Sequence, residues 1–267
     1  MEMLLVNDMK RVAIRLLRTK IFWAGAAAFA LLYAMFWQGR NETQPTGADV
    51  QSKKIPIYSV QSQEKVVALS FDAAWGNEDT DEILKILEKN DVKVTFFMTG
   101  GWVEKYPEDV KKIAEAGHTL ANHSQNHKNM SQLSADECKQ ELMSVHNKVK
   151  ELTGVEMELF RPPYGDYDDL VVDTAFQIGY YPIQWSVDSL DWKNYGVQNI
   201  VDTVLNHKAL ENGAIILMHN GAKYTAKALQ AVIDGLKEKG YTFVTIDQLI
   251  LRENYSIDHT GKQVPKK

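Results

Sequence analysis

The chain has 267 residues, of which 45% are hydrophobic and 24% charged, a composition typical of a globular protein with room for a sizeable core. Its net charge of -5 at pH 7 indicates no strongly basic face, so no nucleic-acid partner is expected. The single cysteine, Cys138, excludes an internal disulfide and a cysteine-based zinc site, and we expect it to be a half-buried helix residue.

The first distinctive segment is residues 21–37, which contains no charged residue. At about 1.5 Å per residue it is just long enough to cross the core of a bilayer. Basic residues precede it, so the positive-inside rule places residues 1–20 in the cytoplasm and the rest outside. We therefore expect a single-pass membrane anchor over 21–37 and a polar linker over 38–54. The alternatives are a cleaved signal peptide and a buried core helix.

From Ile55 onward, segments with the patterns of strands and helices alternate. The expected strands cover 66–71, 92–98, 119–121, 159–160, 181–185, 214–218 and 242–245. The expected helices cover 78–90, 107–116, 134–153, 169–178, 197–210 and 222–239, with Ser134 and Glu137 forming a capping box. Such alternation predicts an α/β domain over 55–251, either a (β/α) barrel or a doubly wound sheet, followed by a polar tail over 252–267.

Two candidate catalytic residues stand at the ends of apolar strands. Residues 66–76 read VVALSFDAAWG, so the chain passes from a buried strand directly into Asp72. His219 follows the apolar run 214–218 in the same way. Folds of the α/β class place their chemistry at the carboxyl ends of strands. Near a carboxylate and a metal, His219 could serve as a general acid; the alternative is a satisfied core histidine.

A pair of histidines follows the short strand 119–121. His123 and His127 are four residues apart, so both imidazoles can reach one divalent metal ion. In isolation a chance pair on a polar loop is an equally good interpretation. The position directly after a strand favours the metal.

A rigid loop provides a further candidate. Arg161 precedes two prolines that fix the shape of the loop, which suits an arginine that orients a carboxylate such as Asp72. The alternative is a surface arginine before a turn. An acidic and aromatic cluster follows, although taken singly its aromatic residues are more often part of a core. Its members are Trp185, Asp188, Asp191 and Trp192.

These segments, in the order SFDAAWG, NHSQNH, RPPYG, WSVDSLDW and ILMHN, resemble the five motifs of the polysaccharide deacetylase family (NodB homology, carbohydrate esterase family 4). The resemblance covers Ile55 to Leu251, and the short anchor with FDAAWG is most similar to the membrane-anchored sporulation deacetylases of the PdaB type. It implies a distorted (β/α) barrel and hydrolysis of N-acetyl groups from N-acetylglucosamine or N-acetylmuramic acid in glycans.

The resemblance also implies catalytic roles. Asp72 would be the general base that activates water, positioned and tuned by Arg161. The backbone N–H of Tyr164 would stabilise the oxyanion. His219 would protonate the leaving amine, with Asp191 stabilising its charged form.

It further implies the metal ligands and the substrate pocket. His123 and His127 would bind a divalent metal, zinc or cobalt. Trp192 and Leu217 would form the pocket for the acetyl methyl group, and Trp75 would contact substrate as well.

The sequence departs from the family at Ala73. The family usually has a second aspartate there, which completes the metal triad. An alanine methyl cannot ligate, so we expect the metal to be weakly bound or absent. Asp72 or water would fill the gap, and Asp79 would substitute only if its loop folded back.

The sequence therefore predicts an extracytoplasmic, membrane-anchored N-deacetylase that acts on cell-wall glycan, in sporulation by resemblance, with low activity because of Ala73. We expect a monomer. One alternative is an inactive family member that binds cell-wall glycan, favoured only by Ala73. Another is a metal-dependent deacylase or amidase for a non-sugar amide.

Overall fold

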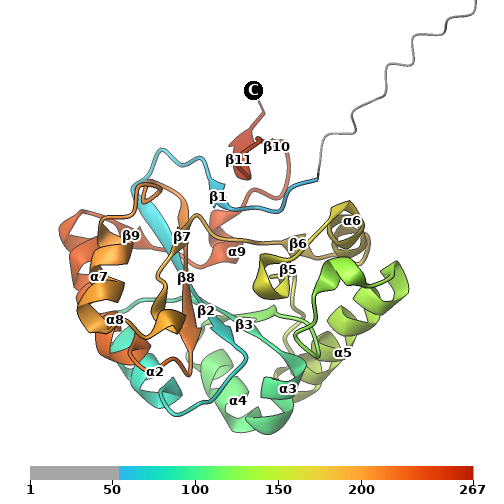
Figure 1. The fold of residues 1–267 in the computed structure, drawn as a ribbon, viewed down its shortest axis with the longest axis horizontal. Coiled ribbons are helices and arrows are strands. Elements are labelled where there is room, and N and C mark those ends of the chain that lie inside the picture. The colour runs from blue at the N-terminus through green and yellow to red at the C-terminus, as the bar shows by residue number, and fades with distance from the viewer. Residues whose placement is uncertain (1–53, 267) are drawn as a thin grey trace, which may run out of the picture. The chain divides into compact units, whose positions relative to one another are not determined.

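A computed structural model describes residues 54–266 (Figure 1). The expected cytoplasmic segment over 1–20, the membrane anchor over 21–37 and all but the last residue of the linker over 38–54 lie outside the described residues. In the part of the chain that is described, no helix combines the length and apolarity of a bilayer crossing.

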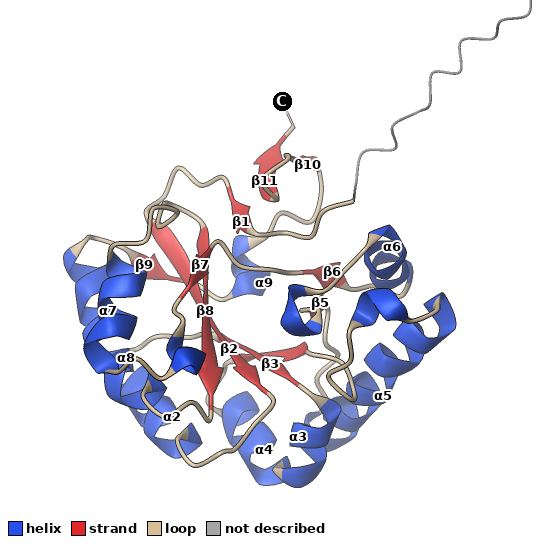
Figure 2. Cartoon of the chain, viewed as in Figure 1, coloured by secondary structure: helices blue, strands red, loops and turns tan. Residues whose placement is uncertain are grey.

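Helices and strands alternate through most of the described chain, as expected (Figure 2). The strands are β1 (Ser59–Val60), β2 (Val66–Ala73), β3 (Thr95–Met98), β4 (Thr119–Asn122), β5 (Leu159–Phe160), β6 (Tyr181–Pro182), β7 (Val187–Asp188), β8 (Ala214–Asn220), β9 (Thr242–Phe243), β10 (Tyr255–Ile257) and β11 (Lys262–Pro265). The helices are α2 (Thr80–Lys89), α3 (Gly100–Lys105), α4 (Pro107–Glu115), α5 (Ala135–Thr153), α6 (Asp169–Gln177), α7 (Val197–Leu205), α8 (Thr225–Glu238) and α9 (Ile246–Leu249). Short 3-10 turns are η1 (Met130–Gln132), η2 (Pro163–Gly165) and η3 (Asp191–Lys193).

Strand β2 lies at the centre of the sheet, between β3 and β8, and runs parallel to both. All eight of its residues are buried, which explains why the strand reads as a nearly continuous apolar run. Side chains alternate between the two faces of a strand. Val67, Leu69 and Phe71 pack into the core cluster that includes the helices. Ser70 and Asp72 share the opposite, inner face.

The sheet is curled, with the order β10-β11-β1-β8-β2-β3-β4-β5-β6. The long helices surround its outer face, as Figure 1 shows. A bridge joins Ile57, just before β1, to Ile183, just after β6, so strands far apart in the sheet order come together. The architecture is therefore a curled α/β half-barrel, and the alternative of a doubly wound sheet is wrong.

The structure differs from the expected elements in a few places. The segment expected as a polar tail forms the antiparallel pair β10–β11, and β11 pairs in parallel with β1. Helix α3 was not expected; its N-cap is Thr99, whose side chain accepts a hydrogen bond from the Trp102 N–H. Helix α7 ends at Leu205, because the following residues form turns that lead into β8.

Helix α5 confirms the predicted capping box. The Ser134 side chain accepts from the Glu137 N–H, and the Glu137 carboxylate accepts from the Ser134 N–H. Cys138 lies in this helix and is 1% exposed, so it is more deeply buried than expected. Burial raises the pKa of its thiol to about 11, which makes it an unreactive core residue.

Candidate active site

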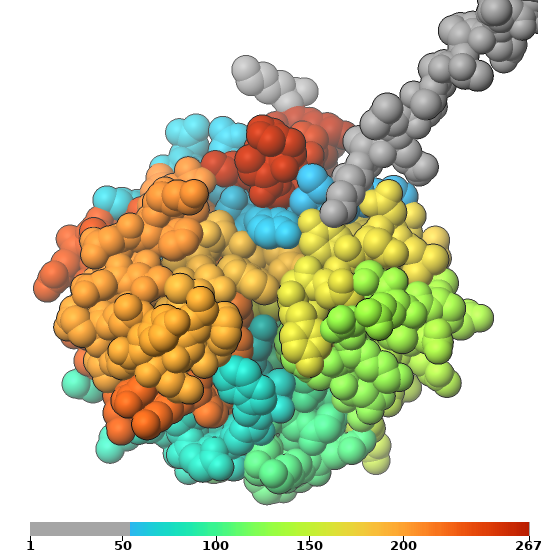
Figure 3. Space-filling view, in the orientation of Figure 1, coloured from blue at the N-terminus to red at the C-terminus, as the bar shows by residue number. Residues whose placement is uncertain are grey.

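A cavity of about 540 Å³ opens at the carboxyl ends of β2 and β8. Figure 3 shows the surface hollowed at the centre of this face, between segments far apart in the sequence. The cavity is lined by Asp72, Ala74, Trp75, His123, His127, Tyr164, Trp185, Asp188, Trp192, Leu217 and His219. Eight of the ten predicted site residues are in this lining. The other two, Arg161 and Asp191, are fully buried and each contacts a lining residue.

The first polar pair is Asp72 with Arg161. Arg161 Nη1 donates to Asp72 Oδ1 at 2.6 Å, and its Nη2 donates to Ser70 Oγ at 2.9 Å. Its guanidinium carbon lies 4.0 Å from the centre of the Phe97 ring. Burial alone would raise the pKa of Asp72, but the charge of Arg161, with smaller contributions from His123 and His219, lowers it. The Asp72 carboxylate is therefore ionised at neutral pH.

The second polar pair is His219 with Asp191. Asp72 and His219 are register partners on β2 and β8, so the two pairs stand side by side. Asp191 Oδ1 accepts from His219 Nδ1 at 2.7 Å, and Oδ2 accepts from the His219 backbone N–H and from Thr225 Oγ1. Burial would lower the pKa of His219, but the hydrogen bond and charge of Asp191 outweigh it and raise that pKa. His219 is thus suited to hold a proton on Nε2.

The two histidines of the second motif face each other. His123 Nε2 and His127 Nε2 are 3.2 Å apart, and His123 Nε2 is 3.5 Å from Asp72 Oδ2. His123 Nδ1 lies 2.7 Å from the Arg161 carbonyl oxygen, which can only accept, so Nδ1 carries the hydrogen and Nε2 has a free lone pair. Burial lowers the pKa of His123 to about 4, so the imidazole is neutral at pH 7.

The loop that carries these histidines needs unusual backbone angles. Ser124 and His127 have φ of 64° and 52°, in the left-handed region that L-residues rarely adopt. Side chains hold the loop in place: Asn122 Oδ1 accepts from the Ser124 N–H, and the buried Glu141 carboxylate accepts from the backbone and side chain of Asn126. The conformation that joins the imidazoles is therefore built in before any ligand binds.

The two imidazoles fit a divalent metal ion. Nitrogens 3.2 Å apart suit two ligands that each lie about 2.0–2.1 Å from one ion. A third protein ligand is missing, since within residues 54–266 no three His, Cys, Asp or Glu side chains are grouped to hold a metal. Ala73 is fully buried at the end of β2, directly after Asp72, and its methyl group cannot ligate a metal. The residues therefore fit a metal site with two histidine ligands.

Asp79 does not replace the missing ligand. Its Oδ1 accepts from Asn220 Nδ2 at 2.6 Å and from the Gly221 N–H at 2.7 Å, which ties the start of α2 to the end of β8. The loop of Asp79 therefore does not fold back to bring this carboxylate to the two histidines.

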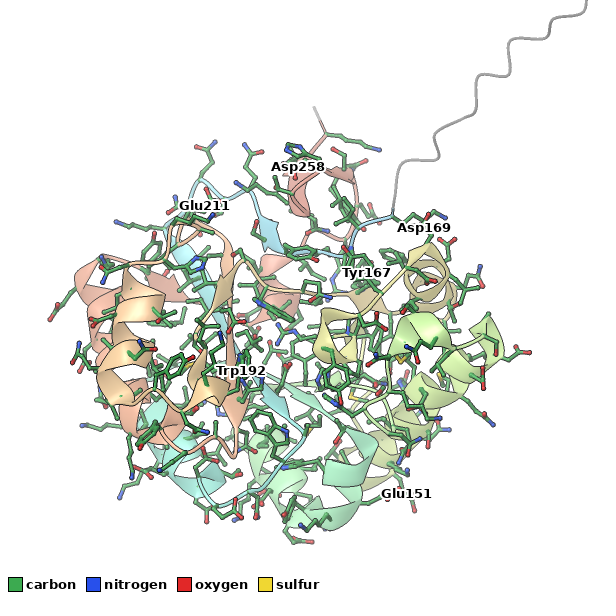
Figure 4. All side chains as sticks on the ribbon, viewed as in Figure 1. Glu151, Tyr167, Asp169, Trp192, Glu211 and Asp258 are labelled. Carbon is green, nitrogen blue, oxygen red and sulfur yellow. The ribbon has the colours of Figure 1, made fainter. Side chains whose placement is uncertain are left out.

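Aromatic residues surround the mouth of the cavity. Trp75 is about half exposed and stacks on His219 with ring centres 5.0 Å apart. Trp192 is similarly exposed and lies at the centre of the face in Figure 4. The Tyr164 ring meets His127 edge-on at 4.5 Å, and Leu217 is buried in the cavity wall. Flat, partly exposed rings of this kind suit contact with sugar rings.

Sequence reasoning missed several residues that support the site. Ser70 binds Arg161 and donates to the Ile216 carbonyl oxygen. Its position two residues before Asp72, on the same face of an otherwise apolar strand, was a usable signal. Thr225, which binds Asp191, gave no such signal because its partner is distant in the sequence. Asn122, which holds the histidine loop, bonds to the Ser124 N–H only two residues away.

The geometry agrees with the comparisons to known proteins. The sequence model of the family described as "Polysaccharide deacetylase" matches residues 59–183. A peptidoglycan-N-acetylglucosamine deacetylase of Bacillus cereus is 34% identical, with 79% of this chain and 97% of that protein covered. The chain belongs to the polysaccharide deacetylase family. Members of this family are hydrolases that cleave the C–N bond of acetamido groups.

Two further relatives bear on activity. The peptidoglycan-N-acetylmuramic acid deacetylase PdaA of Bacillus subtilis is 35% identical, with 74% of this chain and 76% of that protein covered. The solved structure of BA3943, described as a CE4 family pseudoenzyme from Bacillus anthracis, is 36% identical with a TM-score of 0.70, covering 78% of this chain and 70% of that one. A mutant of BA3943 is described as having restored enzymatic activity. This polysaccharide deacetylase is thus similar to active and inactive members.

Proposed function

We propose that this protein is a membrane-anchored, extracytoplasmic N-deacetylase that removes acetyl groups from peptidoglycan or a related glycan, with a metal site reduced to two histidines. The observation that carries the proposal is the placement of Asp72–Arg161 and His219–Asp191 on one cavity, beside His123. An ionised base and a protonatable acid are thereby available to the same bound amide. The uncharged segment over 21–37 supports the anchor, and the role in sporulation rests on the PdaB-type resemblance.

The residues would divide the reaction between them. Asp72 accepts a proton from water as the water oxygen attacks the carbonyl carbon, and Arg161 keeps the carboxylate ionised and oriented. The backbone N–H of Tyr164 donates to the oxygen that becomes negative. His219 then donates its proton to the nitrogen as the C–N bond breaks. The products are acetate and a free amine on the sugar.

His123 and His127 would hold the divalent ion, zinc or cobalt. When bound, such an ion polarises the amide carbonyl and lowers the pKa of its water. Because Ala73 supplies no ligand, affinity for the ion is expected to be low. Leu217 and Trp192 would enclose the acetyl methyl group, and Trp75 would support the sugar while stacked on His219.

The missing third ligand favours one alternative function. A protein that keeps the groove without turnover would bind cell-wall glycan, and BA3943 shows that this family includes pseudoenzymes. The intact polar pairs favour hydrolysis, since a binding protein has no need for an ionised carboxylate beside a protonatable imidazole.

Acetate release by the full-length protein, from N-acetylglucosamine oligomers and from peptidoglycan, tests the proposal. The assay is run with added zinc or cobalt and with chelator, and Asp72→Asn is the matched control because it keeps the size of the side chain. Release that depends on both metal and Asp72 supports the deacetylase. Glycan binding without release by wild type under any condition would favour the binding protein.

Ala73→Asp tests the reduced metal site. Without metal the new carboxylate is buried beside the core and should lower the free energy of unfolding by about 1–3 kcal/mol. Added zinc should restore more stability to this variant than to wild type, and zinc affinity should rise. Equal zinc affinity in the two proteins would contradict the idea that Ala73 weakens the site.

A further inference from the structure

A second cavity lies beside the catalytic one. It measures about 380 Å³ and is lined by Trp75, Trp192, Asn194, Gly221, Ala222 and Lys223. Trp75 and Trp192 line both cavities, so the two spaces adjoin across this pair of indole rings. A substrate that rests on the two tryptophans can therefore extend from one cavity into the other.

The second cavity is a built feature of the fold. Gly221 has φ of +84°, and a Cβ there would come within 2.8 Å of the Gly76 carbonyl oxygen. Only glycine allows the loop after β8 to approach the loop after β2 this closely. The partly buried Asp79 carboxylate fixes the same junction by accepting from the Gly221 N–H and from Asn220. The wall next to Lys223 is therefore held in place.

The two cavities differ in charge. The catalytic cavity is lined by two carboxylates, Asp72 and Asp188. Lys223 is the one ionisable residue in the lining of the second cavity. It is exposed and contacts the Tyr224 ring at 5.0 Å, and among the ion pairs of residues 54–266 none involves it. Lys193 adds a second cation over the Trp192 ring. A carboxylate would thus be attracted to the second cavity, where two cations are close to it and the described lining residues include no carboxylate.

We propose that the second cavity binds a carboxylate substituent of the glycan, so that the site selects an acid-bearing N-acetyl sugar over a neutral one. The inference rests on the proposed function. In N-acetylmuramic acid the lactyl carboxylate is attached at O3, next to the carbon that bears the acetamido group. With the acetamido group beside Asp72 and the ring against the tryptophans, the carboxylate reaches towards Lys223. N-acetylglucosamine has only a hydroxyl at that position.

Lys223→Met in the full-length protein tests the inference, because methionine keeps an unbranched apolar stem and removes the charge. Lys227→Met is the matched control, since Lys227 lies four residues further on, in the first turn of α8, and contacts the same Tyr224 ring but does not line the cavity. Lys223→Arg should retain binding. The ligands are a muramic-acid-containing oligomer and a neutral N-acetylglucosamine oligomer of equal length. Binding is measured by calorimetry and acetate release is measured alongside.

Wild type should prefer the acidic oligomer, and Lys223→Met should lose about fivefold in affinity for it, as expected for one partly exposed ion pair. Its affinity for the neutral oligomer should not change, and higher salt should narrow the difference. Equal losses for both oligomers, or an equal loss in Lys227→Met, would overturn the carboxylate site while the deacetylase stands. Failure to bind or hydrolyse either oligomer would refute the proposed function and this inference with it.

Discussion

The pairing of His219 with Asp191 gives a prediction that needs no activity assay. In Asp191→Asn the oxygen should take the place of Oδ2, which accepts from the His219 backbone N–H and from Thr225. The new amide nitrogen then faces His219 Nδ1, where the carboxylate stood 2.7 Å away. Because an amide N–H donates, the neutral imidazole should change tautomer, leaving Nδ1 without a hydrogen and placing one on Nε2.

The variant should also hold its proton less tightly. Asp191 opposes the effect of burial and raises the pKa of His219, so its replacement should lower that pKa. A hydrogen bond to a charged group contributes about 1.5–3 kcal/mol, which sets the scale of the loss. The raised pKa stabilises the folded protein fully below the pKa of the unfolded state, about 6.5, and this stabilisation disappears as pH rises through the folded pKa. The stability difference between wild type and variant should therefore be larger at pH 5.5 than at pH 9.

Nitrogen NMR of the full-length protein reports the tautomer and titration of His219, and urea unfolding at the two pH values reports the stability. Thr225→Val is the matched control, since it removes a donor to Asp191 without touching the imidazole. An unchanged tautomer and pKa of His219 in Asp191→Asn would refute the reasoning.

Three further changes should alter stability in ways that urea unfolding can measure. Arg161→Met leaves the Asp72 carboxylate buried without its cation, so the free energy of unfolding should fall by about 3–5 kcal/mol at pH 7. The loss should be smaller at pH 4, because Asp72 takes up a proton there. The same loss at both pH values would contradict this pairing. Burial, aided by the charge of a nearby lysine, lowers the pKa of His118 to about 4, below its value in the unfolded chain. The free energy of unfolding of wild type should therefore fall by on the order of 2 kcal/mol between pH 7 and pH 5. His118→Gln keeps an acceptor for the Val94 N–H but does not titrate. The fall in its free energy of unfolding between the two pH values should therefore be smaller than that of wild type by the same amount. Leu69→Ala opens a cavity in the centre of β2 and should cost about 2–5 kcal/mol at every pH, with a negligible loss arguing that the strand repacks.

The sequence predicted most of the fold because the apolar strands and the capped helices are local patterns. β2 and β8 were visible as apolar runs, and their register brings Asp72 beside His219. The motifs likewise located the histidine pair. What could not be predicted depends on contacts distant in the sequence. Short polar strands such as β10 and β11 have no apolar run to mark them, and they form because β1 offers an edge to pair with.

Support of the site was harder to predict than the site itself. The left-handed conformations of Ser124 and His127 occur in a loop that Glu141, from α5, holds through Asn126, and no local pattern predicts this contact. Asp79 was considered as a metal ligand, yet the fold uses its carboxylate to join two loops. A carboxylate in a loop has several possible partners, and tertiary packing decides among them.

The position of β11 has a consequence for biosynthesis. β1, at the start of the described domain, lies between β8 and β11, and Ser59 pairs with both Ala214 and Lys262. A ribosome produces the partners of β1 only after nearly the whole domain has been made. The first strand must therefore wait with open edges while the central strands assemble, and chains that stop short of β11 would display an unpaired β edge that chaperones and proteases can recognise.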